Sequence, residues 1–131
     1  MKKIRLFIFL GVVFWFNAAM IIRFLGANVF SAGSPKLVLM FILAIPVTVV
    51  SIYITKVASG FQYHELLRPM VVMTFIATFC DGIAMTWFRS LYSDSFEVAF
   101  YGAALILWGV GIGLLMAFYL ELKHTNNPNE V

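Results

Sequence analysis

The sequence predicts an all-α membrane protein of four antiparallel transmembrane helices, and three observations lead to this expectation. The chain of 131 residues is 63% hydrophobic and only 11% charged, whereas soluble domains carry about a quarter charged residues. Four apolar runs reach or approach the roughly 20 residues that a spanning helix needs. Three short polar connectors separate these runs, so successive helices should cross the bilayer in alternate directions.

The four expected helices cover residues 4–25, 37–58, 70–88 and 98–120. The first run is basic at its start, but it lacks an A-x-A cleavage site, so we expect a retained helix and not a signal peptide. Ser34 should cap the second helix, with Pro35 at its first position, where no amide hydrogen is missed. Pro69 should begin the third helix in the same way. Asp94 and Glu97 have the spacing of a capping box for the fourth helix.

The chain is expected to form one domain, residues 1–124, followed by a disordered polar tail, residues 125–131. Six lysines and arginines lie at the two termini and in the second connector, against three on the opposite side. The first set is Lys2, Lys3, Arg5, Lys56, Arg68 and Lys123, and the second is Arg23, Lys36 and Arg89. This asymmetry predicts a protein of the inner membrane with both termini in the cytoplasm.

The same composition excludes several classes of function. The basic residues are scattered between apolar runs, which does not favour a nucleic-acid surface. Cys80 is the single cysteine, so it has neither a disulfide partner nor a second thiolate for a metal site. No nucleophile elbow, phosphate loop or metal-binding histidine motif occurs, and His64 in the second connector is interpreted as a solvated side chain. We therefore expect no enzymatic activity, no cofactor and no metal.

Asp81 is the exception, because it lies inside the third apolar run, roughly 18 Å from its cytoplasmic end. Ionisable side chains at such depth are costly and often functional. Asn17 and Trp108 are expected at a similar depth, and each has an N–H group to donate to a carboxylate. Trp15 and Tyr92, in contrast, are interpreted as part of the aromatic belts at the membrane surfaces.

Two stripes of hydroxyl side chains accompany Asp81. Thr74 and Thr78 share its face of the third helix, and Thr48 and Ser51 share one face of the second helix. If the stripes face one another, they outline a polar cleft that opens to the cytoplasm and ends at Asp81. Alternatively, the hydroxyls bond to their own helix backbone and Asp81 only fixes the helix register.

Small residues line one face of the fourth helix, and they include a GxxxG step. They are Gly102, Gly109, Gly113 and Ala117. Such a face lets another helix approach closely. The approaching helix can be an internal neighbour, a second copy of the chain or another membrane protein.

Three segments, 13-VFWFNAAMIIRFLG-26, 81-DGIAMTWF-88 and 102-GAALILWGVGIGLL-115, resemble an uncharacterised family of small four-helix bacterial membrane proteins. The resemblance implies a bacterial origin and a four-helix fold, and it brings no known activity. Two hypotheses of function follow from the residues. The favoured one is a structural or accessory membrane protein in which Asp81 and Asn17 form a buried polar lock. The alternative is a small proton- or cation-coupled carrier that uses Asp81 at the end of the hydroxyl-lined cleft.

Overall fold

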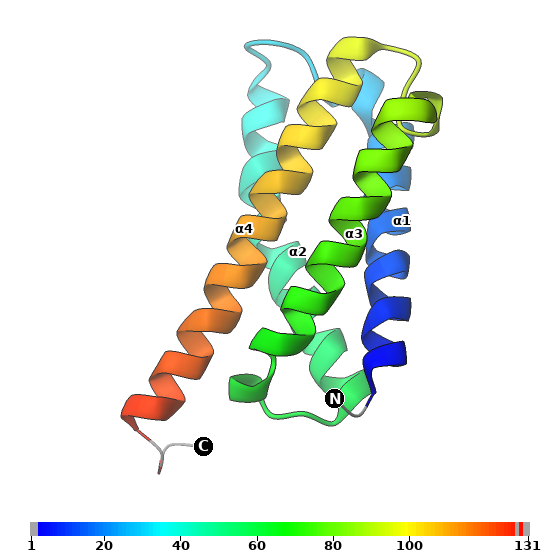
Figure 1. The fold of residues 1–131 in the computed structure, drawn as a ribbon. Helices are drawn as coiled ribbons and strands as arrows, with labels where there is room; N and C mark the ends of the chain where they lie inside the picture. The colour runs from blue at the N-terminus through cyan, green and yellow to red at the C-terminus, as the bar shows by residue number, and fades with distance from the viewer. Residues whose placement is uncertain (1–2, 128, 130–131) are drawn as a thin grey trace.

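The computed structural model describes residues 3–127 and 129. Its elements are the helices α1 (Ile4–Val29), α2 (Pro35–Ser59), α3 (Leu67–Trp87) and α4 (Phe96–Asn126), with the short 3-10 turns η1 (Tyr63–Glu65) and η2 (Arg89–Leu91) (Figure 1). All four helices are long and apolar enough to cross a membrane. This part of the chain contains no strand, so the predicted all-α fold with four helices of membrane-spanning length is confirmed.

Every helix extends past the predicted bounds at one end or both, because hydropathy marks only the most apolar part of a helix. The exceptions are the start of α1, which is at residue 4 as predicted, and the end of α3, which is one residue earlier than predicted. The largest difference is at the C-terminal end of α4. Thr125 and Asn126 were predicted to be disordered, but both are helical, and the Thr125 hydroxyl donates to the Glu121 carbonyl at 3.1 Å. Residues 128, 130 and 131 of the predicted tail lie outside the described residues.

The residues at both ends of α2 and at the start of α3 agree only in part with the predicted helix caps. Ser34 is the N-cap residue of α2 and Pro35 is its first residue, as predicted, although the Ser34 side chain makes no capping hydrogen bond. At the other end Gly60 adopts a φ of 73°, a left-handed conformation that glycine reaches without strain. Helix α3 begins at Leu67, so Pro69 is its third residue and not its first.

The predicted capping box of α4 is wrong. Ser95 is the N-cap residue, and its hydroxyl accepts a hydrogen bond from the Val98 N–H at 3.4 Å. The Glu97 carboxylate instead accepts from the Ala32 N–H at 3.0 Å. Glu97 therefore ties α4 to the connection between α1 and α2, a contact between distant segments that local spacing cannot indicate.

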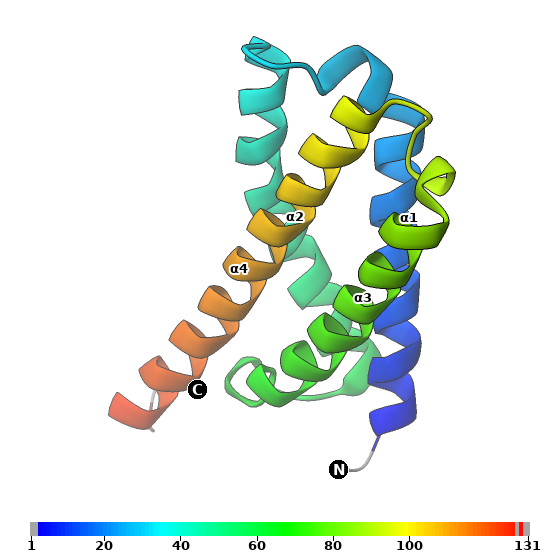
Figure 2. The same cartoon turned by 45° about the horizontal axis from the view of Figure 1, so that its top comes forward.

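The helices form a bundle in which α1 packs most closely on α3, and α2 on α4. Helices α3 and α4 are also neighbours, whereas α2 and α3 approach each other less closely. These two still meet where the Thr55 hydroxyl of α2 donates to the Met73 sulfur of α3 at 3.8 Å. Both chain termini lie at one end of the bundle, which we call the terminal end (Figures 1 and 2). The connections α1–α2 and α3–α4 lie at the opposite end, which we call the loop end.

Most of the apolar surface points outward. In the most apolar 18-residue window of each helix, only 11–22% of the residues are buried inside the protein. Large side chains such as Phe24, Leu107 and Leu115 are at least two-thirds exposed. Water would not tolerate a surface of this kind, and the acyl chains of a bilayer are the solvent that matches it.

Candidate functional site

Asp81 belongs to a chain of hydrogen bonds near the loop end. The Tyr92 hydroxyl donates to Asp81 Oδ1 at 2.5 Å, and the Trp15 indole N–H donates to the Tyr92 hydroxyl oxygen at 2.8 Å. Tyr92 is completely buried. The chain therefore joins three segments, because Trp15 lies on α1, Asp81 on α3 and Tyr92 in the connection that follows η2.

Tyr92 reaches this position because the connection folds back onto the bundle. The 3-10 turn η2 reverses the backbone after α3, and the Tyr92 N–H donates to the Arg89 carbonyl at 3.0 Å. Burial raises the pKa of the Tyr92 hydroxyl well above its ordinary value, and the hydrogen bond to Asp81 raises this pKa further. Tyr92 therefore keeps its proton and remains a donor throughout the physiological pH range.

Asn17 is not the partner of Asp81, and the predicted Asp81–Asn17 lock is wrong. The Asn17 side chain is exposed and donates to the Val13 carbonyl of its own helix at 2.8 Å. Two residues along an α-helix correspond to a turn of about 200°. Since Trp15 faces Asp81, Asn17 must face away from it.

Trp108 is also away from Asp81. Its indole N–H donates to the Phe41 carbonyl at 3.0 Å, so it links α4 to α2. Pro46 lies in the same part of α2, where it removes one backbone donor from the helix. Trp15 and Tyr92 thus take the role predicted for Asn17 and Trp108. No pattern in the sequence indicates this exchange, because both aromatic residues are equally suited to a membrane surface.

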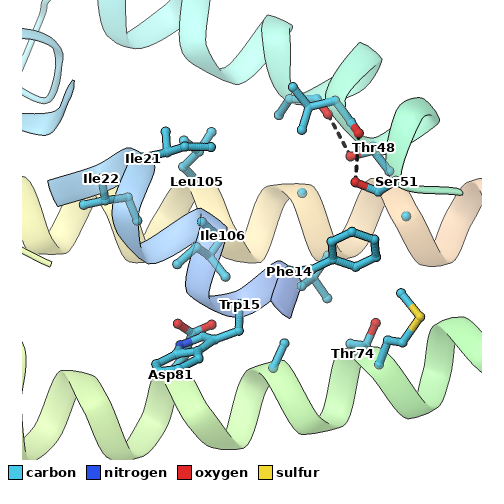
Figure 3. Close-up of a pocket in the computed structure, with 18 of the residues that line it drawn as sticks. Phe14, Trp15, Ile21, Ile22, Thr48, Ser51, Thr74, Asp81, Leu105 and Ile106 are labelled. Atoms are coloured by element: carbon cyan, nitrogen blue, oxygen red, sulfur yellow. Dashed lines mark hydrogen bonds between the residues drawn. The ribbon is translucent and has the colours of Figure 1, made fainter. Parts of the chain in front are cut away.

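A groove of about 450 Å³ runs along the bundle and is lined by residues of all four helices (Figure 3). Four of the seven residues predicted for the polar site line it, namely Asp81, Thr74, Thr48 and Ser51. In Figure 3 the Asp81 carboxylate lies beside the Trp15 indole, and the three hydroxyl residues lie farther along the groove. Thr78 is exposed and does not line it. Residues of both polar stripes thus line one groove, with Thr78 as the exception.

The groove opens on the side of the bundle, and the predicted opening toward the cytoplasmic end is wrong. Its exposed lining residues are Ile21 and Leu25 on α1 and Leu43 and Val47 on α2, with exposed fractions of 40–56%. The lining residues of α3 and α4 are all buried or half-buried. The opening therefore lies between α1 and α2, at the level that faces acyl chains.

The hydroxyl groups contribute little polarity to this groove. Thr48 donates to the Ala44 carbonyl at 2.7 Å, and Ser51 donates to the Val47 carbonyl at 2.9 Å. These are the bonds to the preceding turn that Ser and Thr commonly make in membrane helices. The lining is consequently apolar over most of its length, with Asp81 as its acidic group.

The arginines near the loop end contact groups other than the Asp81 carboxylate. Arg23 donates to the Ser90 carbonyl at 2.6 Å and forms an exposed ion pair with Asp94 at 3.9 Å. Arg89 approaches the Asp94 carbonyl and the face of the Phe96 ring. Among residues 3–127 and 129, no lysine or arginine forms an ion pair with Asp81.

Most of the small-residue face of α4 is used inside the bundle. A Cβ atom at Gly102 would lie 2.8 Å from Ile22 of α1, and one at Gly113 would lie 3.0 Å from Met70 of α3. Ala117 is completely buried. Gly109 differs, because a Cβ atom there would meet nothing within 4 Å and would extend into the groove that this residue lines. Of the alternatives left open by the sequence, the internal neighbour is the one that occupies this face.

A second group of side chains lies at the terminal end. The rings of His64 in η1 and His124 in the last turn of α4 stack with their centroids 3.6 Å apart and their planes at 10°. The capping box of η1 uses Glu65, whose carboxylate accepts from the Gln62 N–H at 2.8 Å. His64 is therefore in contact with α4 and is not the solvated side chain that the sequence indicated.

No known protein family, curated protein or solved structure matches this chain. The resemblance to a family of small bacterial membrane proteins stays a prediction. What the site can do is therefore argued from its own residues: a half-buried carboxylate bound by a buried tyrosine, at one side of an apolar groove with exposed apolar side chains at its opening.

Proposed function

We propose that this protein is a non-enzymatic structural or accessory protein of the bacterial inner membrane, in which Trp15, Tyr92 and Asp81 form a polar lock. Its four helices span the bilayer in alternate directions, and both termini lie in the cytoplasm. The observation that carries the proposal is the complete burial of Tyr92 with its hydroxyl on Asp81.

A hydrogen-bonded lock of this kind can stabilise a helix bundle in a bilayer. Helices in lipid gain little from apolar contact with one another, so hydrogen bonds and close packing decide how they associate. The Tyr92 hydroxyl uses both its donor and its acceptor capacity, and the Trp15 indole uses its only donor. The hydroxyl and the indole are satisfied together with one oxygen of the Asp81 carboxylate, which holds the connection α3–α4 against α1.

The orientation is supported by the distribution of positive charge. The start of α1, the end of α4 and the α2–α3 connection lie at the terminal end. Among the described residues, this end carries Lys3, Arg5, Lys56, Arg68 and Lys123, and the loop end carries Arg23, Lys36 and Arg89. The positive-inside rule places this end in the cytoplasm. A partner that docks on the small-residue face of α4 is not part of the proposal, because three of its four positions are covered by the protein's own helices.

A small proton- or cation-coupled carrier is the second candidate. It is favoured by one observation, that Asp81, Thr74, Thr48 and Ser51 line a single groove. The hydroxyls of Thr48 and Ser51 are engaged by their own helix, and the opening faces lipid. A route for hydrated ions therefore has less support than a lock.

Infrared difference spectroscopy of the Asp81 carboxyl band decides between the two. The protein is placed in nanodiscs and measured from pH 5 to pH 9, and the Asp81→Asn variant identifies the band. The lock predicts a band that does not change over this range, because Tyr92 holds the carboxyl group and bulk water does not reach it. A band that titrates between pH 5 and pH 9 would contradict the lock and support the carrier.

A further inference from the structure

The groove contains a carboxylate, Asp81, that forms no ion pair with any lysine or arginine in the described part of the chain. Asp81 Oδ1 accepts from Tyr92, but the nearby arginines bind Ser90, Asp94 and the Phe96 ring instead. A carboxylate in an apolar environment is costly unless it is paired. The lock accounts for the hydrogen bond to Asp81 but not for the open volume that runs along the helices beside it.

The size and lining of the groove match those of a small-molecule site. Its volume is about 450 Å³, and pockets for small ligands range from about 300 to 1,000 Å³. Such pockets are mostly apolar and contain few polar groups that fix the orientation of the ligand. Here Asp81 is such a group, and Thr74, whose side chain also lines the groove, is a second.

The opening restricts where a ligand comes from. Its rim consists of exposed apolar side chains of α1 and α2, such as Ile21 and Val47. A ligand would thus enter sideways from the acyl-chain region, and it has to dissolve there. Asp81 is six residues from the end of α3, which places it about 9 Å inside the helix end.

The charge and the aromatic side chains restrict what the ligand is. A positive group beside Asp81 would complete an ion pair, and it would lie next to the Trp15 indole, whose face attracts cations. A zwitterionic phospholipid does not fit this chemistry, because its phosphate would follow its ammonium group into an apolar groove. The ligand should carry a single positive charge on an apolar body.

We infer that the groove is a binding site for small lipophilic organic cations, with the cationic centre held between Asp81 and Trp15 and the apolar body lying along α1 and α2. This inference goes beyond the lock and does not depend on it. The lock uses the hydrogen bond from Tyr92, whereas the binding site uses the negative charge of Asp81 and the open volume beside Gly109.

Tetraphenylphosphonium is a suitable probe, because tetraphenylborate has the same shape and the opposite charge. Binding of each ion to the purified full chain in phosphatidylcholine nanodiscs is measured by equilibrium dialysis, against empty nanodiscs. We expect saturable binding of the cation and none of the anion. Equal binding of both ions, or the absence of saturable cation binding, would overturn the inference.

Two pairs of variants test separately the negative charge of Asp81 and the open volume of the groove. Asp81→Asn removes the charge and keeps an oxygen that accepts from Tyr92, and Asp94→Asn removes an exposed charge at the same end of the bundle. Gly109→Leu fills the groove, and Gly111→Leu adds the same side chain where there is also open space but no groove lining.

Asp81→Asn should weaken tetraphenylphosphonium binding about tenfold or more, which corresponds to the loss of one charge-assisted contact. Gly109→Leu should weaken it about as much, because the new side chain occupies volume that the apolar body of the ligand needs. Asp94→Asn and Gly111→Leu should leave it unchanged. Unaltered binding in Asp81→Asn would show that the cation does not use this carboxylate.

Adding phosphatidylethanolamine to the nanodiscs should not compete with tetraphenylphosphonium; competition would assign the groove to a lipid. Circular dichroism and gel filtration confirm that each variant is folded.

Discussion

The two sides of α1 are both apolar, but they pack in opposite ways. Toward α3 the helices are so close that a Cβ atom at Gly11 would lie 2.9 Å from the Met73 carbonyl oxygen. Toward α2 the helices separate, and Ile21 and Leu25 remain exposed at the rim of the groove. In a bilayer, apolar character does not decide which helices touch, because lipid is as apolar as leucine. Small residues and buried polar groups decide it.

The first prediction tests the close packing of α1 on α3 and has the largest expected effect. Gly11→Leu should lower the free energy of unfolding by about 3 kcal/mol, because the new side chain meets the backbone of α3, which cannot move aside as a side chain does. The measurement is unfolding in mixed micelles by titration with a denaturing detergent.

Gly109→Leu is the matched control, since its side chain enters the groove without a clash. Its free energy of unfolding should change by less than about 1 kcal/mol. Equal destabilisation by the two substitutions would mean that the α1–α3 contact is not tighter than the groove.

The second prediction tests the lock. Tyr92→Phe removes the hydroxyl and leaves the Asp81 carboxylate and the Trp15 indole without their common partner. The expected loss is about 1–3 kcal/mol, the cost of unsatisfied buried polar groups. Tyr119→Phe is the control, because Tyr119 is mostly exposed. If both variants unfold alike in the same titration, the lock does not stabilise the protein.

The third prediction concerns alkaline pH. The pKa of Tyr92 is raised in the folded protein, so above the ordinary tyrosine value of about 10 the unfolded chain loses a proton that the folded chain keeps. Stability should therefore be unaffected by this group below that pH and fall above it, by at most about 1.4 kcal/mol per pH unit. Tyr92→Phe should remove this part of the slope. The measurement is the free energy of unfolding of the wild type and of Tyr92→Phe between pH 9 and pH 11. If the two fall in parallel with pH, Tyr92 does not cause this part of the pH dependence.

The sequence was sufficient for the four spanning helices and for Asp81 as the central polar residue. Long apolar runs report helices directly, and an intramembrane carboxylate stands out in any sequence of this composition. It was also sufficient to place Thr48, Ser51 and Thr74 on faces that share one groove. These inferences depend only on spacing within a single helix.

The partners of Asp81 could not be predicted in the same way. Asn17 was expected because it lies at a similar depth, but depth along a helix does not say which way a side chain points. Tyr92 was placed at the membrane surface, because nothing in its connector shows that the chain folds back into the bundle. Contacts between elements depend on the packing order of the helices, which hydropathy does not contain.

The last prediction has the smallest expected effect and separates the two candidate partners of Asp81. Asn17→Leu removes an exposed amide that bonds only to the Val13 carbonyl of its own helix. The free energy of unfolding should change by no more than about 0.5 kcal/mol, as for other surface substitutions. Combined with Tyr92→Phe, it should add nothing beyond its own effect, because the two side chains share no partner. If Asn17→Leu instead lowers the free energy of unfolding as much as Tyr92→Phe does, Asn17 belongs to the lock. Helix α1 would then be rotated so that Asn17, and not Trp15, faces Asp81.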